Sequence, residues 1–157
     1  MRASTRGVGM KFFALSLFLM STQTAWAFWP FSATTVMEGR IYGGFEPSGE
    51  VDVRLLTNGD VIRVANGKQK VLGSVPMSRV RDIQKAIETV REERLALEDP
   101  DAQACEGAPS TTYIAYPKDG GSVRLGERIN CLLTRNMDFQ GSKLLDVLMG
   151  LEKLGAF

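Results

Sequence analysis

Hydrophobic and polar residues alternate most regularly at residues 51–55, where charged side chains separate Val51, Val53 and Leu55. This two-residue period predicts a strand with one buried face and one polar face. Asn58-Gly59 follows and favours a type I′ hairpin turn, because both central residues of that turn need positive φ. We therefore expect residues 61–64 to return as the partner strand.

Further strands are expected on either side of this hairpin. A second Asn-Gly pair, Asn66-Gly67, predicts another tight reversal into residues 68–72. Residues 34–42 have moderate strand character and end at Gly43-Gly44. The first part of the domain is thus predicted to be a meander of three strands, with residues 34–42 as a candidate fourth.

After these strands the hydrophobic period becomes that of a helix. Apolar residues recur on one helical face at Val80, Ile83, Ile87, Val90 and Leu97. This stripe predicts an amphipathic helix. Ser74 or Ser78 could cap its start, and Asp99-Pro100 is expected to end it.

A second β unit and a second helix complete the chain. Residues 111–116 predict a strand that turns at residues 117–121 and returns at residues 122–125. Residues 129–133 either extend this strand or begin a new one. A last helix is expected from about Ser142 to Gly155, with an apolar face formed by Leu144, Val147, Leu148, Leu151 and Leu154.

The order β-β-β-α-β-β-α predicts an α+β fold of antiparallel β-meander or hairpins and two amphipathic helices. Each half consists of strands followed by one helix. The simplest arrangement is one shared sheet with both helices on the same face, since each helix has one apolar stripe to bury.

Residues 1–27 have the three parts of a secretory signal peptide. Three basic side chains (Arg2, Arg6 and Lys11) precede a nine-residue apolar stretch at residues 12–20, and Ala25-Trp26-Ala27 is an A-x-A cleavage site. Nine helical residues rise about 14 Å, roughly half of a bilayer's hydrocarbon core. We therefore expect cleavage after Ala27 and a secreted or periplasmic protein. The alternative is an uncleaved anchor that continues to Phe31.

The chain has two cysteines, Cys105 and Cys131. In an exported protein an isolated pair predicts one structural disulfide, worth about 3–4 kcal/mol by the chain-entropy estimate. The C-x-x-C spacing of redox-active pairs is absent from the sequence. Residues 34–157 are therefore expected to form a single small disulfide-stapled domain, preceded by an aromatic segment at residues 28–33.

Composition excludes most catalytic chemistry. The chain has no histidine, so Ser-His-Asp and Cys-His sites and His-based zinc sites are impossible. The acidic pairs Glu92-Glu93 and Asp99/Asp101 are typical of solvated surface, and the glycine pairs lack a phosphate-binding context. We predict no catalytic residue, metal site or cofactor. The remaining enzymatic alternative would rely on carboxylates, tyrosines or lysines alone.

Charge and aromatic residues bear on partners. Basic and acidic residues number 19 and 18, and three of the basic ones lie in the signal peptide, so the remainder is slightly acidic and nucleic-acid binding is not expected. Phe28, Trp29 and Phe31 surround Pro30 outside any periodic element. These aromatic side chains either fold back on the core or contact a protein partner or a membrane surface.

Four features resemble a known family. They are Gly43-Gly44-Phe45 beside an early strand, an amphipathic helix, a hairpin with Gly120-Gly121, and a leucine-rich C-terminal helix with Leu144, Leu145 and Leu148. Over about residues 40–154 this layout resembles emfourin, a small inhibitor of thermolysin-like metalloproteases. The resemblance implies an α+β binding protein that could inhibit a protease, and no inhibitory residue is matched. The signal peptide, the cysteine pair and the longer first β region differ from that family.

The sequence therefore predicts an exported, non-enzymatic binding protein that acts on a protein partner, with inhibition as one form of that activity. The alternative is a structural or assembly component of the cell envelope, tethered through residues 28–31.

Overall fold

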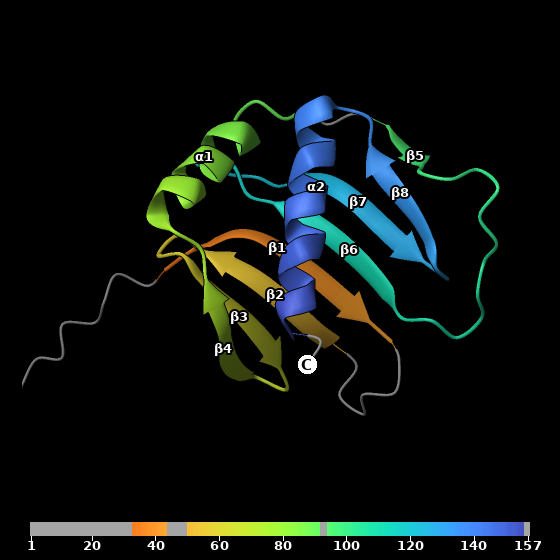
Figure 1. Cartoon of the computed structure of the whole chain (residues 1–157), viewed down its shortest axis with the longest axis horizontal. Helices are drawn as coiled ribbons and strands as arrows, with labels where there is room; N and C mark the ends of the chain where they lie inside the picture. Colours follow the sequence, from red (N-terminus) through yellow and green to blue (C-terminus); the bar gives the residue numbers. More distant parts are fainter. Residues whose placement is uncertain (1–32, 44–49, 92–93, 156–157) are drawn as a thin grey trace, which may run out of the picture. The chain divides into compact units, whose positions relative to one another are not determined.

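One antiparallel sheet and two helices make up the described residues, 33–43, 50–91 and 94–155, of the computed structural model (Figure 1). All of them belong to a single unit that spans Phe31–Phe157. The predicted signal peptide and the aromatic residues Phe28, Trp29 and Phe31 lie outside the described residues. So do Phe45 and the pair Glu92-Glu93.

Four strands precede the first helix and four precede the second. In chain order the elements are β1 (Thr35–Tyr42), β2 (Glu50–Leu56), β3 (Asp60–Ala65), β4 (Lys68–Ser74), α1 (Met77–Ile87), β5 (Leu95–Leu97), β6 (Ser110–Ala115), β7 (Val123–Ile129), β8 (Leu132–Asn136), α2 (Phe139–Glu152) and the 3-10 helix η1 (Lys153–Gly155). The α+β class and the alternation of strands with helices are confirmed.

The eight strands share one sheet in the order β4-β3-β2-β1-β6-β7-β8-β5. The candidate strand at residues 34–42 is β1, and it lies in the middle of the sheet. There it pairs with β2 on one side and with β6 on the other, so β1 and β6 join the two halves of the domain (Figure 1).

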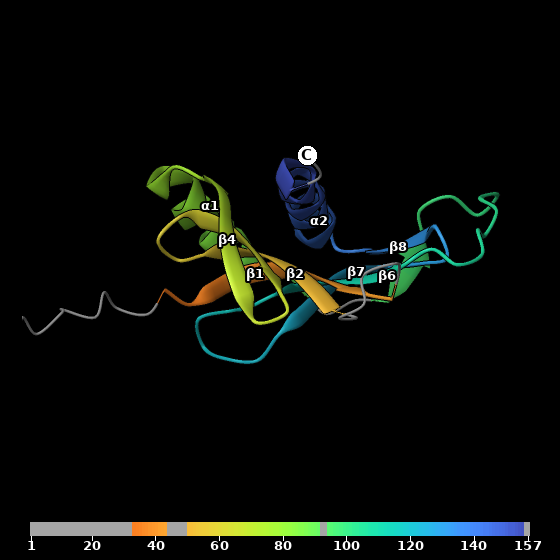
Figure 2. The same ribbon diagram turned by 90° about the horizontal axis from the view of Figure 1, so that it is seen from below.

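Both helices cover the same face of the sheet, as the view along it shows (Figure 2). The core lies between the helices and the sheet, because strand residues that point toward the helices alternate with residues that point away. Its members include Val53, Leu55, Val61, Val80, Ile83, Ile87, Tyr113, Leu125, Leu145 and Leu148. Each aliphatic side chain among them contributes about 1.5–3 kcal/mol when fully buried.

α2 packs closely on β7 because residue 126 is glycine. A Cβ at Gly126 would lie 2.5 Å from the carbonyl oxygen of Thr134 and 2.8 Å from Leu145 Cδ2. Both distances are too short for real carbon atoms. The absence of a side chain at Gly126 therefore lets Leu145 approach the strand directly.

The prediction for the first helix is wrong at both ends. α1 ends at Ile87, and Leu97 lies instead on β5, paired with Thr134 of β8 and 46% exposed. The N-cap residue is Pro76 without a side-chain hydrogen bond, so neither Ser74 nor Ser78 caps the helix.

The turns refine the hairpin predictions. Asn66 and Gly67 have φ of 54° and 70°, as a type I′ turn requires. The type I′ prediction at Asn58-Gly59 is wrong, because only Gly59 has positive φ there and its N–H donates to Leu56 O at 2.9 Å. At residues 129–133 a new strand begins, since Asn130 and Cys131 form a tight turn with φ of 49° and 69°.

The second helix begins three residues before the predicted start. Asp138 caps it by accepting hydrogen bonds from the N–H groups of Gln140 and Gly141, each at 3.0 Å. Leu154 lies beyond α2 in η1 and is 51% exposed, so it is not part of the buried stripe.

Cys105 and Cys131 form a disulfide with a Cα–Cα distance of 5.6 Å, as predicted. The Cys105 N–H also donates to Asn130 O at 2.8 Å. Together these contacts tie the loop between β5 and β6 to the turn between β7 and β8. In the part of the chain that the structure describes, no helix is long and apolar enough to cross a membrane.

Candidate functional site

The face of the sheet opposite α2 carries a buried carboxylate at its centre. Met37 points into the core, and the Cα of Gly39 faces Glu152 of α2. Because side chains alternate along a strand, Glu38 and Arg40 point to the other face. Glu38 is only 2% exposed there.

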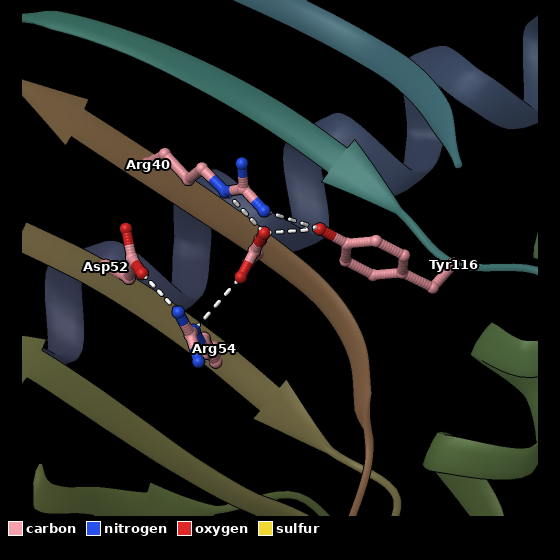
Figure 3. A network of polar contacts seen from close by, with 5 residues as sticks. Arg40, Asp52, Arg54 and Tyr116 are labelled. Atoms are coloured by element: carbon pink, nitrogen blue, oxygen red, sulfur yellow. Dashed lines mark hydrogen bonds and ion pairs between the residues drawn. The ribbon is translucent and has the colours of Figure 1, made fainter. Parts of the chain in front are cut away.

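Three side chains surround the Glu38 carboxylate. Its Oε1 accepts hydrogen bonds from Arg40 Nε at 2.6 Å and from the Tyr116 hydroxyl. Its Oε2 lies 3.0 Å from Arg54 Nε as an ion pair, although the angle is not that of a hydrogen bond. In Figure 3 the labelled side chains converge in front of the sheet, with α2 behind it. Each oxygen of Glu38 therefore lies against an arginine, and Oε1 also accepts from the Tyr116 hydroxyl.

A second carboxylate orients Arg54. Asp52 lies two residues before Arg54 on the same face of β2, is 6% exposed, and accepts a hydrogen bond from Arg54 Nη2. Arg40 Nη2 in turn donates to the Tyr116 hydroxyl at 3.1 Å. The two guanidinium groups are thus held by two carboxylates and one phenol.

Strand register brings these residues together. Glu38 is paired with Arg54 across β1 and β2, and Arg40 is paired with Asp52, so opposite charges face each other directly. Tyr116 follows β6 immediately, and its N–H donates to Val36 O at 2.9 Å. The network therefore needs strands from both halves of the domain.

The phenol in this network is neutral at neutral pH. Burial raises the pKa of Tyr116 to about 12, and the hydrogen bond to Glu38 acts in the same direction. Burial alone would lower the pKa of Arg40, but its hydrogen bonds to Glu38 and Tyr42 raise that pKa overall. Tyr116 therefore serves as a donor to Glu38, and Arg40 stays charged.

A cavity of about 690 Å³ opens beside the network. Its lining comes from the start of β1, the end of β2, α1 and the loop after β6: Thr34, Thr35, Val36, Glu38, Arg40, Arg54, Thr57, Gln84, Tyr116, Pro117, Lys118, Gly120 and Gly121. The Lys118 N–H donates to Glu88 Oε1 at 2.8 Å, which fastens this loop to the residue that follows α1.

Another buried carboxyl lies on the opposite side of the sheet. The Tyr113 hydroxyl donates to Glu152 Oε2 at 3.1 Å near the end of α2, and the guanidinium of Arg128 lies 5.9 Å from the Tyr113 ring centroid. Burial raises the pKa of Glu152, although Tyr113 and Arg128 act against that shift. This pair does not line the cavity.

Of the candidate residues taken from the sequence that the structure describes, only Gly120-Gly121 lies at this site. The disulfide does not line the cavity, and Asp99 and Asp101 form an exposed local turn in which the Asp101 N–H donates to Asp99 Oδ1 at 3.0 Å. Gly120-Gly121 is a turn, as predicted, with φ of 97° and 82°, and it also lines the cavity. Phe28, Trp29 and Phe31 stay untested as partner contacts.

Sequence reasoning missed Glu38, Arg40, Arg54 and Tyr116. One signal was present: an acid and an arginine two residues apart occur in both early strands, as Glu38-x-Arg40 and Asp52-x-Arg54. On a strand this spacing places both charges on one face.

The lining residues are not arranged as a metal site, because Glu38 is their only carboxylate. Among the described residues no group of three or more Cys, Asp or Glu side chains could hold a metal ion. Comparison of the chain with protein-family models, with curated proteins and with solved structures gives no match. Any inference about function therefore rests on the geometry of this cavity.

Proposed function

We propose that the protein is an exported, non-enzymatic binding protein that engages a protein partner at the sheet face opposite α2, with inhibition of that partner as one form of its action. The site is the cavity beside Glu38. Export is supported by the signal-peptide pattern at residues 1–27 together with the Cys105–Cys131 disulfide.

The observation that carries this proposal is the occupied state of the Glu38 carboxylate. A general base takes a proton from substrate with a free lone pair, whereas Arg40 and Tyr116 donate to Glu38 Oε1 and the Arg54 guanidinium lies against Oε2 as an ion pair. Tyr116, with its pKa raised to about 12, is also a poor acid or base near neutrality. The cavity is thus better suited to hold a ligand than to transform one.

Export is tested on the full chain expressed with its own N-terminus. We expect the purified protein to begin at Phe28 and to have no free thiol. An intact Met1 together with two reactive cysteines would contradict export.

Partner binding is tested with a photo-crosslinking amino acid placed at single positions in the exported protein. Lys118 and Gln84 line the cavity, whereas Gly150 is an exposed position on α2 where an added Cβ would meet no atom within 4 Å. We expect a discrete protein adduct from the two cavity positions and none from Gly150. Equal adducts from all three positions, or none, would refute the assignment of this face.

A further inference from the structure

Several hydrogen-bond donors of the side chains that line the cavity have no partner among the residues that the structure describes. We infer that the cavity binds the carboxylate of an acidic side chain that the protein partner contributes. This inference rests on the proposed function and assigns the chemistry by which that site recognises its partner.

Donors dominate the capacity that the cavity leaves unused. A guanidinium has more N–H groups than the contacts of Arg40 and Arg54 employ. Lys118 is at the cavity rim, and an ammonium donates only. The one acidic lining residue, Glu38, already has an arginine at each oxygen. A ligand that supplies acceptors to the cationic groups therefore fits this cavity best.

Charge leads to the same ligand. The cavity lining has three cationic side chains (Arg40, Arg54 and Lys118) and one carboxylate. Two acids outside the lining partly balance these cations: Asp52 forms an ion pair with Arg54, and Glu88 Oε1 accepts from the Lys118 N–H. Among the lining side chains themselves the cations are in excess, so a partner's carboxylate is attracted to them, whereas a partner's lysine or arginine is repelled.

The donors are also held in place before a ligand arrives. Glu38 and Asp52 fix the two guanidinium planes from the sheet side, so little side-chain freedom remains to be lost on binding. Planar guanidinium groups match the two oxygens of a carboxylate. Thr34, Thr57 and Gln84 add neutral polar groups around them, which suit the peptide backbone that flanks an acidic side chain.

The volume is consistent with a short peptide segment. Sites for small ligands occupy about 300–1,000 Å³, and this cavity has about 690 Å³. That space exceeds one carboxylate side chain and leaves room for its neighbours. We therefore expect the cavity to bind an acidic side chain within an exposed segment of the partner.

The test uses the oxidised, isotope-labelled protein and a short Gly/Ser peptide with three consecutive glutamates, compared with the same peptide carrying glutamines. Binding is followed by NMR through the backbone amides of Gly120 and Gly121, with Gly150 as a distant reference. We expect the glutamate peptide to shift the two cavity glycines and leave Gly150 unchanged. Equal shifts with the glutamine peptide would overturn the inference.

Two variants assign the contact. Lys118→Gln removes a charge at the cavity rim that takes no part in the Glu38 network. We expect this substitution to weaken binding of the glutamate peptide about fivefold. Arg40→Gln should weaken binding of the same peptide at least about tenfold, provided that circular dichroism shows a folded protein. Lys153→Gln, an exposed lysine of η1, is the matched control and should have no effect. Unchanged binding in Lys118→Gln and in folded Arg40→Gln would refute the inference.

Inorganic phosphate and glutarate are the remaining probes. If either competes as strongly as the peptide, the cavity is a site for small free anions and the peptide assignment fails. If Lys118 yields a partner adduct in the crosslinking experiment while the glutamate peptide does not bind, the carboxylate inference fails and the proposed function stands. If no adduct forms at any position, the proposed function itself fails.

Discussion

Replacing Glu38 with glutamine tests whether its carboxylate is the centre of the polar network. The substitution keeps the shape of the side chain but removes the charge that Arg40, Arg54 and Tyr116 share. The amide can still accept with its oxygen, whereas its NH₂ group must point at one of the donors. Two positively charged guanidinium groups are then left without their common partner (Figure 3).

The size of the effect follows from the contacts. A hydrogen bond to a charged group contributes about 1.5–3 kcal/mol, and Glu38 has three charged or polar partners. The full sum does not apply, because the Arg40 and Arg54 side chains are 37% and 30% exposed and can turn toward water. We expect the free energy of unfolding to fall by about 2–3 kcal/mol, equivalent to about 10 °C in Tm for a domain of this size.

The assay is urea unfolding of the oxidised protein followed by circular dichroism. Glu98→Gln is the matched control, because Glu98 also accepts from an arginine, Arg135 Nη2 at 2.7 Å, but is 44% exposed. Exposed ion pairs contribute less than about 1 kcal/mol. If Glu38→Gln lay within about 0.5 kcal/mol of wild type, or matched Glu98→Gln, the reasoning about the buried network would be wrong.

Three further perturbations test other parts of the fold. Cys105→Ser should lower the free energy of unfolding by about 3–4 kcal/mol, measured by urea unfolding with reductant-treated wild type as the comparison; a loss under about 1 kcal/mol would contradict a structural role. Because burial raises the pKa of Glu152, the folded wild type binds that proton more tightly than the unfolded chain and loses stability as pH rises above about 4.5. Glu152→Gln should therefore gain stability relative to wild type at about pH 7 and not at about pH 4, and a gain of equal size at both would contradict this assignment. Gly126→Ala should destabilise by at least about 1–3 kcal/mol through its clash with Leu145, whereas Gly150→Ala, in an open helical position, should stabilise by up to about 1 kcal/mol; equal effects in thermal unfolding would refute the close approach of α2 to β7.

Local patterns in the sequence were sufficient for elements whose geometry is decided locally. The stripe Val80, Ile83 and Ile87 predicted the buried face of α1, and Asn66-Gly67 predicted a turn that both residues adopt with positive φ. The predicted helix extended too far because Leu97 follows Val90 by seven residues. This spacing is that of two helical turns, but here it is a coincidence. The positions between them, including Arg94, continue no apolar stripe, and pairing with β8 places Leu97 on a strand.

The candidate site could not be predicted because its geometry depends on contacts between distant residues. Glu38 and Gly39 are weak strand formers, so nothing local indicated that β1 is central. The burial of Glu38 depends on Arg54 from β2 and on Tyr116, 78 residues away in the sequence. Glutamate and arginine are typical of exposed positions when considered alone, so neither Glu38 nor Arg54 indicated a buried site.

The pairing of β1 with β6 has a consequence for the order of folding. Most other pairings in the described sheet join neighbours in the chain, whereas this one brings residues 37–42 to residues 110–115. Closing so long a loop has an entropic cost that local hairpins avoid. We therefore expect the four-stranded meander and the C-terminal hairpins to form first and their docking to be the later, slower step. Because Glu38 and Tyr116 belong to opposite sides of that junction, a chain whose halves have not yet docked lacks this network, and we expect the proposed binding to require the completely folded domain.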